Sequence, residues 1–347
     1  MYSTNVIEKK RILLVWPWFR TLAINYAEIL SNEHFDVRVI TTNKSWDQDE
    51  SRVVITLMQE FSFWKFPFDA LRIFASAKKF KPDIIFTEKY SDPRFFLLKF
   101  LKVPVKVLFI HDVIKHGIED ELTGLRKISE KFTNLKVNEL CTFSEFSQNQ
   151  LIGSHRISLL PEYPISRIPR PNAKLDRKNF VTFGRIYPYK NLEWLSSNWE
   201  IISSRLGFEE LHIYGLGDID LSAQGVQHFN ARFERDSLID QLGQYRCAIF
   251  PYLSATQSGT LLLAHIGSVS SVTSDFGGFR EYQQPNSSYF TNPKSIPEIQ
   301  EKLLPYLNNK YASEKGLLAH EHISKVISQT KNDSETLLRN ILTKYTL

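Results

Sequence analysis

Two cations follow a short apolar run in the second half of the chain. Residues 180–183 lead into Gly184, Arg185 comes next, and Lys190 follows five residues later, where a helix is expected to begin. A guanidinium and an ammonium at this spacing can neutralise a diphosphate. Two solvated surface cations are the plainer alternative, although positive charge at a helix start opposes the helix dipole. We predict that Arg185 and Lys190 stabilise charge on a diphosphate, with Gly184 beside them.

A loop of small polar residues forms a second candidate phosphate site. It follows the apolar run Cys247–Phe250 and leads into an expected helix that opens near Thr260. Backbone N–H groups at a helix N-terminus are unpaired and lie at the positive end of the dipole, so they bind phosphate oxygens. Ser258 is also a preferred N-cap residue, and capping uses the same donors. The predicted binding residues are Gln257, Ser258, Gly259 and Thr260.

Polar residues follow another apolar run in the first half. Val105–Ile110 is followed directly by His111 and Asp112, and then by His116. Ligands of open α/β folds bind beyond the carboxyl ends of the strands, so a histidine placed there can hydrogen-bond a substrate. A lone histidine is more often a satisfied structural group. We treat His111 as a candidate catalytic residue, and His116 as a candidate to face a phosphate.

Metal-binding patterns do not stand out in the sequence. The nine histidines are scattered, with no pair four residues apart beside carboxylates. Asp47 and Asp49 have the spacing of an acidic metal pair, but their polar surroundings favour a solvated loop. No G-x-S-x-G nucleophile elbow is present either. We therefore expect chemistry without a metal or a bound cofactor, in which Arg185, Lys190 and helix dipoles stabilise negative charge.

Four segments in order resemble the C-terminal half of GT-B glycosyltransferases, in particular the large retaining family 4. They read FGRIYPYKN, LHIYGLGD, FPYLSATQSG and TSDFGGFRE, and together span about 100 residues. A looser match extends to the first half through residues 12–17, 109–112 and 142–145. The resemblance implies an α/β protein with two Rossmann-like domains, whose parallel sheets face a central cleft that holds a nucleotide sugar.

The chain departs from the family pattern in two places. Most members carry two glutamates eight residues apart, whereas Ala255 and Leu263 stand at these positions. A subgroup that reads ATQSG has a similar loss of the first acid. Residues 16–21 replace the glycine-rich first loop. Glu281 matches the family's loop acid, which implies contact with a nucleotide ribose or base. An ion pair with Arg280, or contact with a helix start, is equally consistent with the sequence.

The resemblance also implies an activity. It is that of a retaining, metal-independent glycosyltransferase (EC 2.4 class) that takes a sugar from a UDP- or GDP-linked donor. The acceptor would be a saccharide, lipid-linked as in O-antigen, capsule or other surface polysaccharide biosynthesis, with Arg20, Asp112 and His116 on the acceptor side. Two alternatives stay open: a nucleotide-sugar epimerase of GT-B architecture, and a non-catalytic nucleotide-sugar-binding protein.

Two α/β domains are expected to position these residues. Short apolar runs alternate with amphipathic segments, which is typical of parallel sheets covered by helices on both faces. The expected strands are residues 11–16, 36–41, 52–57, 83–87, 105–110, 140–143, 157–160, 180–183, 211–214, 247–250 and 269–273, and the clearest helices of the first half are 22–31 and 67–79.

The domain limits follow from composition. Residues 161–178 contain four prolines and five cations, among them Arg177, which predicts an exposed linker. We divide the chain into an acceptor-binding domain (1–165), a linker (166–178), a nucleotide-sugar-binding domain (179–330) and a terminal segment (331–347). The pattern of residues 332–346 is helical, and by resemblance this segment crosses back onto the first domain.

Bulk composition indicates which class of protein the chain fits. The chain of 347 residues is 42% hydrophobic and 23% charged, which is typical of a globular protein, and its length suits two domains. Cys141 and Cys247 lie in or beside expected strands, so we expect reduced core thiols. A net charge of +5 is too small to indicate nucleic acid.

The apolar runs indicate where in the cell the protein is expected. No run reaches the roughly 20 residues that span a bilayer, and the first residues do not resemble a signal peptide, so we expect a cytoplasmic protein. Residues 61–81 and 94–102 mix aromatic and cationic side chains. Such segments either lie on anionic lipid, as in a peripheral membrane protein, or pack as ordinary helices with wet cationic ends. The sequence leaves both open.

Overall fold

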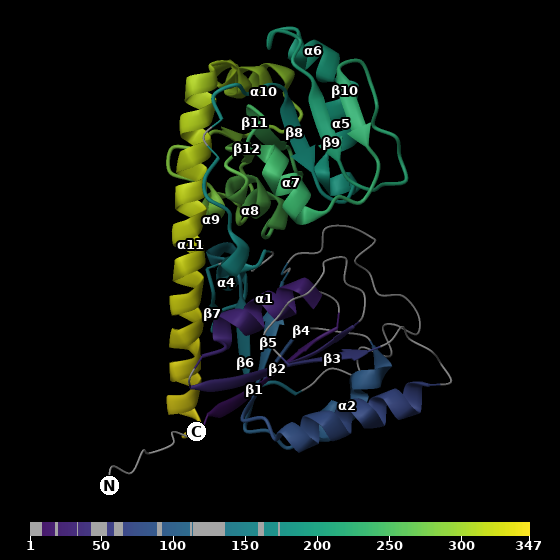
Figure 1. Ribbon diagram of the computed structural model, residues 1–347, viewed down its shortest axis with the longest axis vertical. Helices are drawn as coiled ribbons and strands as arrows, with labels where there is room; N and C mark the ends of the chain where they lie inside the picture. Colours follow the sequence, from purple (N-terminus) through teal and green to yellow (C-terminus); the bar gives the residue numbers. More distant parts are fainter. Residues whose placement is uncertain are drawn as a thin grey trace.

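A computed structural model describes residues 9–17, 20–32, 34–42, 54–58, 65–88, 92–111, 113, 136–158, 163–172 and 174–347. These residues form two α/β domains stacked one on the other, with a long helix beside both (Figure 1). Each domain is built on one parallel sheet, which confirms the predicted fold class.

The first domain contains a seven-stranded parallel sheet. Its strand order is β3-β2-β1-β4-β5-β6-β7. The strands are β1 (Lys10–Trp16), β2 (Phe35–Thr42), β3 (Val54–Met58), β4 (Ile84–Glu88), β5 (Val105–Ile110), β6 (Glu139–Thr142) and β7 (His155–Arg156). The helices and 3₁₀ turns between them are α1 (Arg20–Leu30), α2 (Phe66–Phe80), η1 (Pro93–Phe100) and α4 (Glu145–Gln150). Apolar runs form the central strands because both faces of a covered parallel sheet are buried.

The second domain repeats this strand order in a six-stranded sheet, β10-β9-β8-β11-β12-β13. Its strands are β8 (Phe180–Phe183), β9 (Leu211–Tyr214), β10 (Val226–Phe229), β11 (Cys247–Phe250), β12 (Ser271–Ser274) and β13 (Tyr289–Phe290). Its helices and turns are η3 (Ile165–Arg167), η4 (Pro188–Lys190), α5 (Leu192–Ser197), α6 (Trp199–Ser203), α7 (Arg235–Leu242), α8 (Gly259–Ile266), α9 (Phe279–Tyr282), α10 (Ile296–Leu303) and η5 (Leu304–Leu307).

The strand order locates the ligand-binding edge of each sheet. In both domains the order reverses beside the first strand, between β1 and β4 and between β8 and β11. Ligands of open α/β sheets bind beyond the carboxyl ends of the strands at this switch point. The loops that carry Gly184 and Gln257 follow β8 and β11, so both leave the switch point of the second sheet.

The last helix, α11 (Asn309–Lys344), runs along both domains (Figure 1). Ile323 and Ile327 pack in the core around α8, while Leu337 and Ile341 pack in the core of the first sheet. The helix begins at Asn309, well before the helical pattern noted in the sequence. One continuous helix therefore contributes apolar side chains to both cores.

Several elements differ from the sequence prediction. Strand β7 lies two residues earlier than expected. Strand β10 was missed because polar residues interrupt it, and β13 because it is only two residues long. The expectation that Arg177 is exposed is wrong. Its side chain is fully buried, and its guanidinium donates to the backbone carbonyls of Tyr245 and Ser268 at 3.0 Å. Burial lowers the pKa of Arg177 to about 10.

Both cysteines are buried and unpaired thiols, Cys141 in β6 and Cys247 in β11. Burial raises the pKa of each thiol, so neither is a reactive thiolate at neutral pH. Among the described helices, none combines the length and the apolar character needed to cross a membrane.

Candidate functional site

Lys190 lies against the loop that opens α8. Only 6% of this residue is exposed. A Cβ placed on Gly184 would lie 2.5 Å from Lys190 Nζ and 2.8 Å from Thr260 Cγ2, so the ammonium lies directly over the glycine, with Thr260 beside it. Gly184 has a φ of 114°, a backbone conformation that residues with a side chain rarely adopt. The structure therefore brings Thr260, from the second site predicted from the sequence, next to Gly184 and Lys190 of the first.

Thr260, which lies near this ammonium, belongs to a cluster of three hydroxyl groups. Thr260 Oγ1 lies 2.8 Å from Ser258 Oγ and 3.0 Å from the hydroxyl of Tyr252. The Lys190 Nζ atom lies 5.3 Å from the centre of the Tyr252 ring, within cation–π range. Burial raises the pKa of Tyr252, which therefore stays a neutral hydroxyl. The group offers an ammonium, several hydroxyls and the first turn of a helix to one ligand.

Ser258 is the N-cap of α8. Its Oγ accepts a hydrogen bond from the backbone N–H of Leu261 at 3.3 Å. The positive end of the α8 dipole thus lies at the same place as the Lys190 ammonium. Two positive groups repel each other, and a bound anion relieves this repulsion. The electrostatics of the site therefore favour an anionic ligand.

Arg185 lies differently from Lys190. Its side chain is exposed, and Nη1 donates to the hydroxyl of Tyr187 at 2.9 Å. The two predicted cations leave the same strand end, but Lys190 is buried against α8, while the described contacts of Arg185 are with Tyr187.

The glycine pair after β9 allows close packing of the neighbouring loops. A Cβ on Gly215 would lie 2.0 Å from the carbonyl oxygen of Gly184, and one on Gly217 would lie 2.5 Å from Ile186 Cβ. Neither position leaves room for a side chain. The loops after β8 and β9 therefore pack directly against each other, which fixes the backbone that carries Arg185.

His111 lies at the end of β5, and its ring is 12% exposed. Its Nε2 accepts a hydrogen bond from the indole N–H of Trp16 at 3.1 Å and lies 3.4 Å from Oε2 of Glu88. Trp16 and Glu88 end β1 and β4, so their positions at strand ends could have identified them, but our sequence analysis missed both.

Glu281 lies at the boundary between the domains. Its carboxylate accepts hydrogen bonds from the backbone N–H groups of Glu145 and Phe146, at the start of α4. Contact with a helix start is one of the arrangements that the sequence left open. Arg280, its neighbour, pairs with Asp275 instead. That pairing lowers the pKa of Asp275.

The remaining predicted residues are less informative. Arg20 is the first residue of α1. Asp112 and His116 lie outside the described residues, as do Asp47 and Asp49. Within the ranges that the structure describes, no group of three or more His, Cys, Asp or Glu side chains is arranged to hold a metal ion.

A second acidic pair, Asp218 and Asp220, follows β9. Asp220 Oδ1 accepts from the backbone N–H of Ser222 at 3.0 Å and lies 3.3 Å from Nδ1 of His228. The Ser222 N–H lowers the pKa of Asp220. These bonds are local, so Asp220 stabilises a surface turn.

Comparisons with known proteins agree with this architecture. A family model described as "Glycosyl transferase 4-like" matches residues 11–139, and one described as "Glycosyl transferases group 1" matches residues 177–309. No curated protein sequence matches the chain at a significant level.

Solved structures share the fold at low sequence identity. Sucrose-phosphate synthase from Thermosynechococcus elongatus is 12% identical, with a TM-score of 0.70 over 97% of this chain and 100% of that one. A TarM mutant from S. aureus, in complex with fondaparinux, α-GlcNAc-glycerol and UDP, is 13% identical, with a TM-score of 0.68 over 96% and 99%. A glycosyltransferase from Rickettsia africae is 15% identical, with a TM-score of 0.63 over 96% and 99%.

The two family matches cover the two domains, and the shared fold extends over nearly the whole chain. The chain is therefore a glycosyltransferase of GT-B fold, with a glycosyl transferase 4-like domain followed by a group 1 domain.

Proposed function

We propose that the chain is a retaining, metal-independent glycosyltransferase that transfers a sugar from a UDP- or GDP-linked donor to a saccharide. The observation that carries this proposal is the burial of the Lys190 ammonium beside the first turn of α8, at the switch point of the second sheet. A diphosphate is the donor fragment whose charge matches this site. The TarM mutant that shares this fold was solved in complex with UDP, which supports a uridine nucleotide as the donor.

The proposed reaction proceeds on one face of the sugar. The acceptor hydroxyl forms a bond to the anomeric carbon as the bond from that carbon to the diphosphate oxygen breaks. The hydroxyl proton passes to the departing diphosphate. The charge that grows on the leaving group is stabilised by Lys190, Ser258 and the first amides of α8. Arg185 binds the outer part of the diphosphate.

The proposed acceptor is lipid-linked, as in surface polysaccharide assembly. Support comes from a face of the first domain on which apolar and cationic residues are exposed together. Phe68 and Leu71 of α2 are 75% and 58% exposed, and Phe100 of η1 is 63% exposed. Exposed cations flank them, namely Lys65, Arg72, Lys78, Lys79, Lys99 and Lys102. Such a face fits the surface of an anionic membrane.

Two experiments test this function. Thermal shift with UDP, GDP and their common sugar conjugates identifies the donor, because a ligand that binds the native state raises Tm. Product analysis by NMR with that donor and a lipid-linked acceptor then reports the anomeric configuration, with and without EDTA. Inversion of the anomeric configuration would refute the retaining mechanism. Metal independence would be refuted if EDTA abolished activity and a divalent metal restored it.

Membrane contact has its own test. Co-sedimentation with vesicles of phosphatidylglycerol should exceed that with phosphatidylcholine, and a Phe68→Ser/Leu71→Ser double variant should lose most of the difference. Ile152→Ser is a matched control, because Ile152 is 97% exposed and lies between α4 and β7, outside α2 and η1. Equal sedimentation with both lipids would remove the proposal of an anionic membrane surface.

A further inference from the structure

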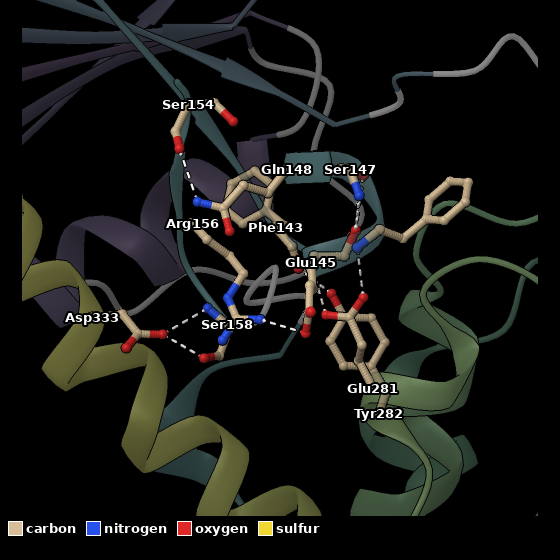
Figure 2. A network of polar contacts seen from close by, with 12 residues as sticks. Phe143, Glu145, Ser147, Gln148, Ser154, Arg156, Ser158, Glu281, Tyr282 and Asp333 are labelled. Carbon is tan, nitrogen blue, oxygen red and sulfur yellow. Dashed lines mark hydrogen bonds and ion pairs between the residues drawn. The ribbon is translucent and has the colours of Figure 1, made fainter. Parts of the chain in front are cut away.

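The carboxylate of Glu281 joins the two domains. Oε2 accepts from the backbone N–H of Glu145 at 2.7 Å, and Oε1 accepts from that of Phe146 at 2.9 Å. Glu281 lies on α9 of the second domain, and the two amides begin α4 of the first. Figure 2 shows this side chain reaching from α9 toward the segment that carries Glu145. Both oxygens are thus used in an interdomain contact with charge-assisted hydrogen bonds.

Two further bonds connect the same segments. The hydroxyl of Tyr282, which lies next to Glu281, donates to the carbonyl oxygen of Phe143, directly after β6 (Figure 2). In the opposite direction, Ser144 Oγ donates to the carbonyl oxygen of Thr256 at 3.3 Å. Residues 143–146 of the first domain are therefore bonded to both α9 and the loop that precedes α8.

The second-domain side of this contact is closely packed. A Cβ on Gly277 would lie 1.8 Å from the carbonyl oxygen of Ala255, and one on Gly278 would lie 2.3 Å from that of Thr256. The glycine turn that leads into α9 is therefore packed directly on the loop of the phosphate site. Glu281 and this loop are therefore expected to move together.

The first-domain side leads to His111. The ring of Phe143 lies 5.5 Å from the ring of His111, and it stacks on Phe109 at 5.3 Å. In addition, Gln257 Nε2 donates to the backbone carbonyl oxygen of His111 at 3.0 Å. The segment held by Glu281 is thus packed against His111, whose backbone is bonded to Gln257.

We infer that Glu281 is a positioning residue: it clamps the start of α4 to α9 and so fixes His111 against the loop of Gln257 and Ser258 for transfer. This inference rests on the proposed function for the transfer step, and on the observed contacts for the clamp. A small displacement between reacting groups lowers the rate of transfer strongly. Glu281 keeps the two halves of the site at one separation and so prevents this loss. Tyr282 supports the same contact.

Amide hydrogen exchange tests the clamp without any substrate. In Glu281→Ala, the amides of Glu145 and Phe146 should exchange at least about tenfold faster, because they lose their acceptor. Glu281→Gln, which keeps one acceptor oxygen, should give a smaller increase. Arg280→Ala is the matched control, since Arg280 pairs with Asp275 and makes no described contact across the interface. Unchanged exchange in Glu281→Ala would overturn the clamp.

Steady-state kinetics tests the positioning role. We expect kcat to fall about 10- to 100-fold in Glu281→Ala, while the Kd of the nucleoside diphosphate stays within about twofold. Tyr282→Phe removes a single hydroxyl and should lower kcat less, which covers the case in which Glu281→Ala does not fold. A loss of nucleotide affinity as large as the loss of kcat would instead make Glu281 a ligand of the donor. Faster amide exchange with unchanged kcat would overturn the positioning role and leave Glu281 as a structural contact only.

Discussion

The side-chain amide of Gln257 donates a hydrogen bond to the backbone carbonyl oxygen of His111 at 3.0 Å, across the two domains. The amide oxygen of Gln257 is buried and has no hydrogen-bond partner among the described residues. Gln257 thus connects the loop of the phosphate site to the end of β5 and still has an acceptor to offer. A buried acceptor of this kind is costly unless a ligand satisfies it.

Gln257→Leu should therefore lower kcat/KM about tenfold, since one interdomain bond and one acceptor are lost. Gln257→Glu should lower it further, because a carboxylate repels both the His111 carbonyl oxygen and a departing diphosphate. Initial-rate measurements with the donor identified by thermal shift give both values. Higher activity in Gln257→Glu than in Gln257→Leu would contradict this account.

Lys190→Ala should lower kcat about 100- to 1000-fold, because the ammonium stabilises charge that develops only as the diphosphate departs. Lys190→Arg should not restore the rate, since Nζ lies directly over Gly184 with Thr260 nearby, where a guanidinium is too large. Lys310→Ala, on the exposed start of α11, is the matched control. Full turnover in Lys190→Ala would remove this lysine from the mechanism.

Gly184→Ala should impair both folding and activity. Its φ of 114° disfavours any side chain, and the new methyl group would overlap the positions of Lys190 Nζ and Thr260 Cγ2. We expect a loss of about 1–3 kcal/mol in the free energy of unfolding, measured by urea denaturation, together with a fall in kcat. Gly153→Ala is a useful comparison, because its φ is also positive but its Cβ would contact nothing. Similar kinetic effects in the two variants would argue against the overlap with Lys190.

Arg177→Met should destabilise the second domain by about 2–4 kcal/mol. The change leaves buried carbonyl groups, including those of Tyr245 and Ser268, without their donor. Urea denaturation followed by tryptophan fluorescence measures the loss. Lys178→Met, one residue later and exposed, should change the free energy of unfolding by less than about 0.5 kcal/mol. Equal effects of the two substitutions would mean that the buried bonds of Arg177 add little stability.

His265 should make stability depend on pH. Burial lowers its pKa to about 3, below the usual value of 6.5, so the folded protein holds a neutral imidazole. The unfolded chain binds this proton below pH 6.5, so the free energy of unfolding falls as the pH drops from 6.5 toward 3, by up to about 1.4 kcal/mol per pH unit. His322, whose pKa is also lowered by burial, adds in the same direction.

Denaturation at pH 5 and pH 7 measures this dependence. His265→Gln should reduce the difference between the two pH values, while retaining a group that can bond Ser271 Oγ as the imidazole does at 3.0 Å. His34→Gln is the control, since His34 is exposed. An unchanged pH difference in His265→Gln would show that other groups cause it.

Much of the fold and part of the site followed from local sequence. Apolar runs gave most of the strands, and Gly184, Lys190 and Ser258 were singled out because each follows such a run. These features could be predicted because they depend on neighbours within a few residues. The exposed appearance of Arg177 was misleading, because its acceptors are the carbonyls of Tyr245 and Ser268, 68 and 91 residues away.

The sequence by itself determined the two parallel-sheet domains and the strand ends that carry the cations. Only the tertiary structure decided that Glu281 contacts the start of α4, that Trp16 and Glu88 surround His111, and that α11 contributes to both cores. The physical reason is sequence separation. A strand forms from its own apolar residues, whereas a contact between domains depends on how two finished surfaces meet.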